Sequence, residues 1–371
     1  MALSHRAQLE QLPAELLFEI ASYLDFLSLE NLSNVSWTLR HVAAHRMFKC
    51  VSLPFLASDI EALKEMAGSP LAKVVKSLTF RVVPSVKNVS GKRELRKGLV
   101  QPIEKIYSRQ TYFQDMEQYF LPEDMSYAEI VEHMSTICEE QSKLPKSSRA
   151  LLSLATTLQQ FTALKELGVD WRLDMADPNG LDIVFVRCRK PNNLCNKHLI
   201  DMITKVIRLR AKDNPITSLQ FSARGTELVS SASYPDRHLL KDAFMSIRSL
   251  HLQAHDGPLR LMAHWADLPE LRCLKMTKFR DIDLDTLDRL CRKSAKTLTV
   301  LHIETKNFVY RGEHYQLAGH IEYCRPITTF MHKIGKDMSL EEVKVQALNH
   351  PEIVRGQLEA LLRGETIPHL C

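Results

Sequence analysis

The chain has 371 residues, of which 45% are hydrophobic and 25% charged, and this composition is typical of a globular protein with a sizeable core. A formal net charge of +5 over 49 basic and 44 acidic residues is too small and diffuse to indicate a nucleic-acid-binding protein. No apolar segment reaches the ~18 residues of a membrane-spanning helix, and the N-terminal residues lack the apolar stretch of a secretion signal. The eight cysteines include no Cys-x-x-Cys pair and favour reduced thiols. We therefore expect a cytoplasmic or nuclear protein that contacts no membrane.

Residues 9–40 predict three short helices that carry more apolar surface than they can bury. Pro13 suits the first position of the first helix, where its missing N–H costs nothing, and Ser28 and Ser36 are candidate caps of the second and third helices. The apolar positions are Leu16, Leu17, Ile20, Ala21 and Leu24, then Leu29, Leu32 and Val35, then Trp37, Leu39, Val42 and Ala43. A module of about 40 residues seldom folds without help. Part of its apolar surface must therefore rest on the remainder of the chain or on another protein.

The order and spacing of these residues resemble the F-box motif over about the first 48 residues. The matching positions are Leu9, Leu12, Pro13, Glu15, Leu16, Leu17, Ile20, Tyr23, Leu24, Leu29, Leu32, Val35, Ser36, Trp37, Leu39, Arg40 and Ala43. The resemblance implies a module that docks on the Skp-type adaptor of SCF ubiquitin ligases and, through it, on cullin and RING subunits. It also implies that the docking surface and the small core beneath it consist of Leu12, Pro13, Leu16, Leu17, Ile20, Leu24, Leu29, Leu32, Val35, Trp37 and Leu39. The alternative is an ordinary N-terminal helical hairpin packed on its own domain.

A second pattern, in which apolar residues follow the spacing L-x-x-L-x-L, recurs seven times after residue 50. The units are Val75-Leu78-Phe80, Leu164-Leu167-Val169, Ile216-Leu219-Phe221, Ile247-Leu250-Leu252, Leu271-Leu274-Met276, Leu298-Leu301-Ile303 and Leu340-Val343-Val345. The last two positions alternate with polar residues, as in a strand with one buried face. Helical stripes at 151–158 and 284–291 precede two units, and helix followed by strand predicts parallel strands. The region resembles the degenerate leucine-rich repeats that follow the F-box in many F-box proteins; the alternative is a non-repetitive α/β domain.

We therefore expect an all-α three-helix F-box at residues 1–50 and an α/β domain at 51–371, built as an irregular leucine-rich-repeat-like solenoid with parallel strands. A charged helical insertion at about residues 84–147 interrupts the second domain. Residues 87–109 carry seven Lys or Arg and two Glu, whereas residues 115–140 carry eight Asp or Glu and no Lys or Arg. Apolar residues between Tyr127 and Cys138 at helical spacing predict a helix with one packed face. The charges are typical of a solvated surface, or alternatively of a docking element for a charged partner.

The sequence contains no recognised motif for catalysis or cofactor binding. No two of its 12 glycines lie closer than seven residues apart, which excludes the usual phosphate-binding loops, and serine-hydrolase and zinc-protease motifs are absent. Cys188, Cys195 and His198 lie close in sequence but lack a second pair of ligands, so we expect them to be structural. We therefore predict no catalytic, cofactor-binding or metal-binding residues, and a protein that is not itself an enzyme.

These observations predict the substrate-recognition subunit of an SCF-type E3 ubiquitin ligase, with the F-box on the adaptor and the repeat region on an unknown protein substrate. No nucleic-acid partner is expected. Candidates for substrate contact, on the solvent side of the predicted strands, are Gln220, His251, Gln253, Lys275, His302 and Glu304. Two alternatives are an F-box scaffold that the adaptor stabilises without a ligase, and an α/β enzyme with an unrecognised site.

Overall fold

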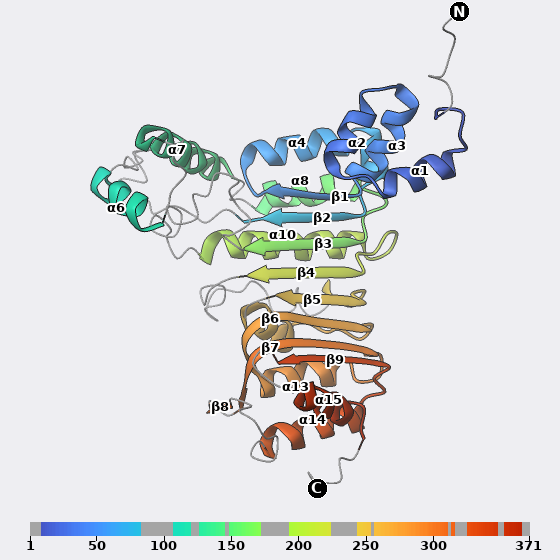
Figure 1. The fold of residues 1–371 in the computed structure, drawn as a ribbon, viewed down its shortest axis with the longest axis vertical. Coiled ribbons are helices and arrows are strands. Elements are labelled where there is room, and N and C mark those ends of the chain that lie inside the picture. Colours follow the sequence, from blue (N-terminus) through green and yellow to red (C-terminus); the bar gives the residue numbers. More distant parts are fainter. Residues whose placement is uncertain are drawn as a thin grey trace, which may run out of the picture.

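The computed structural model describes residues 9–82, 107–119, 126–144, 148–171, 193–223, 243–253, 256–310, 313–315, 325–347 and 352–365. A helical module at the N-terminal end precedes a parallel sheet whose strands are stacked in chain order, with helices packed along it (Figure 1). Within these ranges no helix is long and apolar enough to cross a membrane.

The N-terminal module consists of α1 (Ala14–Ser22), α2 (Phe26–Ser33) and α3 (Trp37–Met47). Pro13 immediately precedes α1, one position earlier than predicted. The predicted cap of α3 is confirmed, because the Ser36 hydroxyl accepts a hydrogen bond from the Leu39 N–H at 3.3 Å. The predicted cap of α2 is wrong: Asp25 caps this helix by accepting from the Ser28 N–H at 2.8 Å. A carboxylate at the N-cap satisfies a free N–H at least as well as a serine hydroxyl, so the helix begins before Ser28.

Nine strands form one sheet in the described part of the chain, in the order β1 to β8, with β9 paired to β7. Every neighbouring pair is parallel except β7–β8. The strands are β1 (Cys50–Pro54), β2 (Ser77–Arg81), β3 (Glu166–Trp171), β4 (Ser218–Ala223), β5 (Ser249–Gln253), β6 (Cys273–Asp283), β7 (Val300–Tyr310), β8 (Glu313–Tyr315) and β9 (Glu342–Ala347). Successive strands are neighbours, as in a solenoid.

The seven predicted strand units are in register and bury the same face of the sheet. One row across the sheet contains Leu78, Leu167, Leu219, Leu250, Leu274, Leu301 and Val343. The next contains Phe80, Val169, Phe221, Leu252, Met276, Ile303 and Val345. All of these side chains are buried. Because side chains alternate between faces along a strand, the intervening polar residues share the opposite face.

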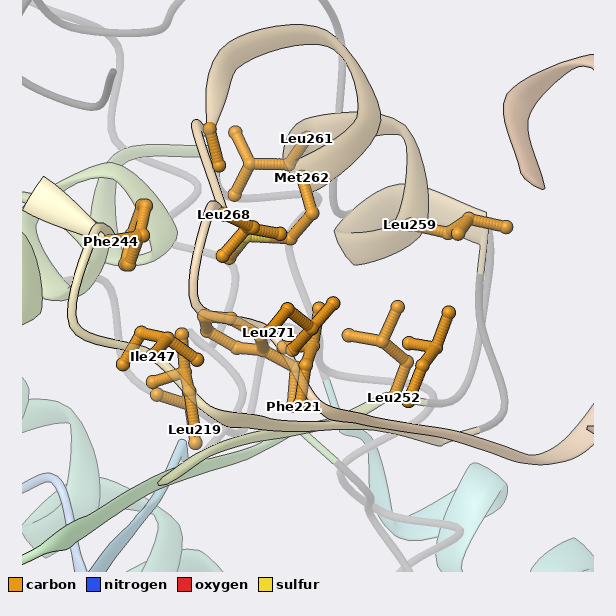
Figure 2. Close-up of a cluster of buried hydrophobic side chains, with 14 of the residues drawn as sticks. Leu219, Phe221, Phe244, Ile247, Leu252, Leu259, Leu261, Met262, Leu268 and Leu271 are labelled. Carbon is orange, nitrogen blue, oxygen red and sulfur yellow. The ribbon is translucent and has the colours of Figure 1, made fainter. Parts of the chain in front are cut away.

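Helices cover the buried face of the sheet. They are α4 (Ala57–Ala67), a 3-10 turn η2 (Pro70–Lys73), α8 (Ser148–Gln159), α10 (Asn193–Arg210), α12 (Asp256–Trp265), α13 (Leu284–Lys293), α14 (Arg325–Asp337) and α15 (Glu352–Leu362). Helices α8 and α13 confirm the two predicted stripes. Figure 2 shows how Met262 of α12 and Leu268 lie over Leu219, Phe221 and Leu252 of the strands. Strands and helices contribute to one continuous apolar core.

Arg210, at the end of α10, connects two helices and a strand. Its guanidinium is buried and donates hydrogen bonds to the carbonyl oxygens of Leu158 at 3.0 Å, Leu164 at 2.9 Å and Asn214 at 3.0 Å. These bonds satisfy the carbonyl groups of Leu158, at the end of α8, and of Leu164, before β3.

The charged insertion contributes α6 (Arg109–Tyr119) and α7 (Tyr127–Lys143), and α7 confirms the predicted helix with one packed face. Ile130 and Met134 of α7 are fully buried. The Glu140 carboxylate accepts a hydrogen bond from the Ser58 N–H in the first turn of α4 at 2.8 Å. This acidic helix is thus packed against α4, while most of the basic stretch at 87–109 lies outside the described residues.

Three features of the sheet were not predicted. Strand β1 begins three residues after α3 and extends the sheet by one strand. Strand β6 continues beyond Met276 through an irregularity at which Lys278 adopts a φ of 57°, and the extra residue returns Phe279 to the buried side. The short β8 pairs antiparallel with β7.

Candidate functional site

Helix α1 carries apolar side chains on two of its sides. Leu17 and Ala21 belong to the core of the helical module, and Leu24 packs against that core. Leu16 and Ile20, one turn apart, are exposed by 44% and 39%. The broad apolar stripe is therefore wider than the core that it covers.

The turns that flank α2 add larger exposed apolar side chains. Tyr23, Phe26 and Leu27 lie around the start of α2 and are exposed, as are Val35 and Trp37 around the start of α3. The side chains of Leu16, Ile20, Tyr23, Phe26, Leu27, Val35 and Trp37 are called the exposed apolar set below.

Neighbouring polar groups hold Trp37 in an outward position. The Arg40 guanidinium lies 5.8 Å from the centroid of the Trp37 ring, a separation at which a cation is attracted to the aromatic face. Arg40 also donates from Nε to the Ser33 carbonyl oxygen at 3.0 Å. These contacts fix an indole that is 80% exposed.

Exposed apolar side chains are concentrated in this module. Thirteen large apolar side chains are exposed in the described part of the chain, and nine of them lie between Leu9 and Trp37. The other four, Phe113, Leu152, Leu209 and Met245, are scattered along the α/β region. A local excess of exposed apolar area in a soluble module is typical of a surface that binds a partner.

The core of the module is separate from the core of the sheet. Leu17, Ala21, Leu29, Leu39, Val42 and Ala43 form a cluster of their own, whereas the sheet and its helices share another. Among the described residues, the sheet region therefore does not cover the exposed apolar set.

Two ionisable groups of the module, Asp25 and His45, have shifted pKa values. Hydrogen bonds from Ser28 to the Asp25 carboxylate hold the pKa of Asp25 below its usual value. Burial lowers the pKa of His45, and the nearby His41 and Lys76 lower it further. The neutral form of His45 is therefore favoured, and its ring packs edge-on to Phe18 with 5.2 Å between the ring centroids.

A comparison with protein-family models finds an F-box domain at residues 9–50. Residues 9–50 of this chain are therefore an F-box domain. The matched residues include all three helices of the module, and an F-box domain implies binding to the Skp-type adaptor of SCF complexes. F-box proteins are generally non-catalytic adaptors for substrates. A search among curated proteins finds no match to the chain.

The predicted adaptor-binding residues of the F-box divide into two groups in the structure. Pro13, Leu16, Ile20, Val35 and Trp37 are exposed. The others are buried (Leu17, Leu29 and Leu39) or partly buried (Leu12, Leu24 and Leu32) and form the core beneath. The prediction did not include Tyr23, Phe26 and Leu27, although Tyr23 and Leu27 continue the spacing of Leu16 and Ile20 in steps of three and four residues.

The polar face of the sheet is a second candidate surface. The register places Gln220, His251, Lys275 and His302 side by side in one row, so four of the six candidates for substrate contact come together. Glu304 lies further along the same face, but Gln253 is buried, where it accepts a hydrogen bond from the Ser222 hydroxyl at 3.0 Å.

Hydrogen bonds link the polar residues of neighbouring strands. His251 and Thr277 are 2.9 Å apart, and His302 and the Glu342 carboxylate are 3.0 Å apart. Glu342 also forms an ion pair with Lys344 at 2.8 Å. Lys344 and His302 lower the pKa of Glu342, because their hydrogen bonds favour its carboxylate form.

Among the residues that the structure describes, no three His, Cys, Asp or Glu side chains form a group that could hold a metal ion. Cys195 and His198 lie on α10, and Cys188 falls outside the described ranges. Burial raises the pKa of the Cys138 thiol to about 11 and that of Cys291 to about 12. Both thiols are therefore protonated at neutral pH and are poor nucleophiles.

Proposed function

We propose that this protein is the substrate-recognition subunit of an SCF-type E3 ubiquitin ligase. Residues 1–50 are the adaptor-binding domain, and residues 51–371 are a substrate-binding domain of irregular, leucine-rich-repeat-like construction. The Skp-type adaptor connects the chain to cullin and RING subunits in the cytoplasm or the nucleus. Ubiquitin transfer takes place on those other subunits, and this chain raises the local concentration of the substrate.

The F-box domain with its exposed apolar set is the observation that carries the proposal. These side chains lie outside the core of the module and outside the core of the sheet region. Their burial against an adaptor contributes roughly 25 cal/mol for each Å² of apolar surface removed from water.

The arrangement of the α/β region supports a role in protein recognition. Its parallel sheet buries one face under helices and carries a row of polar side chains on the other, including Gln220, His251 and Lys275. Rigid strands hold such side chains at fixed spacing, which favours specific contacts with a partner.

Affinity purification of the tagged full-length chain, with ubiquitin conjugation blocked, tests this proposal. We expect the Skp-type adaptor and a cullin to co-purify, together with a substrate that accumulates when the chain is deleted. Recovery of the adaptor without a cullin would instead support a non-ligase scaffold. Loss of the substrate from a Gln220→Ala, Lys275→Ala variant that retains the adaptor would locate recognition on the polar face.

A further inference from the structure

A row of basic side chains follows the amino-terminal edge of the sheet, which lies on the right in Figure 1. The residue immediately before a strand is basic at five strands, namely Lys49, Lys76, Lys165, Arg248 and Arg272. We call these five residues the basic row, and all of them are exposed. The equivalent position holds Thr217 before β4, Thr299 before β7 and Glu341 before β9, so the positive charge is concentrated over β1 to β6.

The backbone holds the members of the basic row side by side. The Lys49 carbonyl oxygen accepts from the Lys76 N–H at 2.9 Å, and the Lys76 carbonyl oxygen accepts from the Lys165 N–H at 2.9 Å. In the same way, the N–H groups of Thr217, Arg248 and Arg272 donate to the carbonyl oxygens of Lys165, Thr217 and Arg248, respectively. With about 4.8 Å between neighbouring strands, the five steps from β1 to β6 give a row roughly 24 Å long.

Two carboxylates lie near the five cations of the basic row, namely Glu166, which follows Lys165 at the start of β3, and Glu270. Arg248 pairs with Glu270 at 3.1 Å, but both side chains are about half exposed, and such pairs contribute little. Lys49, Lys76, Lys165 and Arg272 form no ion pair with any residue that the structure describes. Like charges on adjacent strands repel one another, and an acidic ligand along the row would relieve that repulsion.

The surface beside the basic row is partly exposed, whereas the far edge of the polar face is buried at β3 and β4. The strands begin with short side chains at Ser77, Ser218 and Ser249 and with Glu166 in β3, and all four are partly exposed. Near the carboxyl ends of β3 and β4, Asp170 and Ser222 are buried. At β3 and β4, a ligand on this face therefore has better access from the edge that carries the basic row.

We propose that the basic row binds an extended acidic segment of the protein substrate, running across the strands. This inference rests on the proposed function, because it names the chemistry of the substrate that the α/β region takes. At about 3.3 Å per residue, a segment of about seven residues covers the row.

Charge and composition favour a protein segment over other anions. Single-stranded nucleic acids bind to basic surfaces that also offer aromatic side chains for base stacking, and neither the basic row nor the first residue of any strand beside it is aromatic. A membrane surface favours basic side chains next to exposed apolar ones. The exposed apolar residues of the described α/β region, Phe113, Leu152, Leu209 and Met245, lie outside the row.

The test compares two variants of the full-length chain in complex with the adaptor. The row variant carries Lys76→Gln, Lys165→Gln and Arg272→Gln. The control variant loses the same charge at three exposed lysines elsewhere, through Lys296→Gln, Lys333→Gln and Lys336→Gln. The probes are a labelled twelve-residue peptide of alternating Glu and Ser, its Gln/Ser counterpart, a single-stranded oligonucleotide and vesicles that contain phosphatidylserine.

We expect wild type and control to bind the acidic peptide with a salt-sensitive affinity, and the row variant to bind it about tenfold more weakly. Equal affinity of all three proteins would overturn the inference, as would tighter binding of the oligonucleotide or the vesicles than of the peptide. Recovery of the adaptor with the same preparations tests the proposed function separately, because the basic row shares no residue with the exposed apolar set.

Discussion

Leu16 and Leu17 are adjacent on α1 but differ in burial: Leu16 is 44% exposed, whereas Leu17 is 4% exposed and belongs to the module core. One leucine is therefore available to a partner while the next stabilises the fold. Substitutions at the two positions should separate binding from stability.

Leu17→Ala should lower the free energy of unfolding of the F-box and leave its exposed apolar set unchanged. Removal of a buried leucine side chain costs about 2–5 kcal/mol, which is a large share of the stability of so small a module. Hydrogen exchange of α1 to α3 should report faster opening, while the sheet strands exchange at the wild-type rate. Equal destabilisation by Leu16→Ala would contradict the separate roles of the two leucines.

The cap of α2 should make the F-box sensitive to acid. The pKa of Asp25 is lowered by hydrogen bonds from Ser28, so its contribution is complete above the ordinary carboxylate pKa of about 3.9 and is lost as the pH falls through the lower pKa of the folded state. Asp25→Asn keeps a capping side chain but removes the titration. Thermal unfolding between pH 7 and pH 2.5 should show a steeper decline for wild type than for the variant, and parallel curves would contradict this role.

Glu140 should anchor the acidic helix α7 to α4. Its carboxylate accepts from the Ser58 N–H at 2.8 Å, whereas Glu139 forms an exposed ion pair with Lys143 at 3.1 Å. Glu140→Gln should increase proteolysis and hydrogen exchange in α7 while leaving the strands protected. Glu139→Gln is the matched control, and similar behaviour of both variants would show that the Ser58 contact does not hold the helix.

Gly168 lies on the polar face of β3, directly beside Thr79 of β2. A Cβ atom at Gly168 would come within 2.5 Å of the Thr79 hydroxyl oxygen, so Gly168→Ala should destabilise the domain by about 1–3 kcal/mol. Thr79→Ala should recover part of this loss, which a double-mutant cycle in urea measures. Additive effects of the two substitutions would show that the contact is not the cause.

Features that depend on neighbouring residues in sequence could be predicted. Local spacing identified the three F-box helices, and the alternation in Leu78-Thr79-Phe80 and its six counterparts identified the strands and their buried face. Strand β1 was missed although Phe48, Val51 and Leu53 have the spacing of the other units, directly after the third helix. The cap of α2 was mispredicted because Asp25, three residues before Ser28, is the residue that caps this helix.

Features that join distant segments could not be predicted from the sequence alone. The Glu140–Ser58 contact joins residues 82 positions apart. Arg210 donates hydrogen bonds to the carbonyl oxygens of Leu158 and Leu164, which lie 52 and 46 positions earlier in the sequence. Four members of the basic row occupy the first variable position of an L-x-x-L-x-L unit, namely Lys76, Lys165, Arg248 and Arg272, but they form a row only once the pairing register is known. The same holds for the candidate substrate contacts. Gln220 and His251 are partly exposed whereas Gln253 is buried, and the sequence alone does not show this difference.

The affinity of the full-length chain for its Skp-type adaptor tests the proposed function most directly. Leu16→Glu places a charge in the exposed apolar set, and Leu152→Glu places the same charge at a leucine of α8 that is 47% exposed. Calorimetry should show about a hundredfold weaker adaptor binding for Leu16→Glu and wild-type binding for Leu152→Glu. Unchanged binding by Leu16→Glu, with the F-box still folded, would contradict docking through this surface.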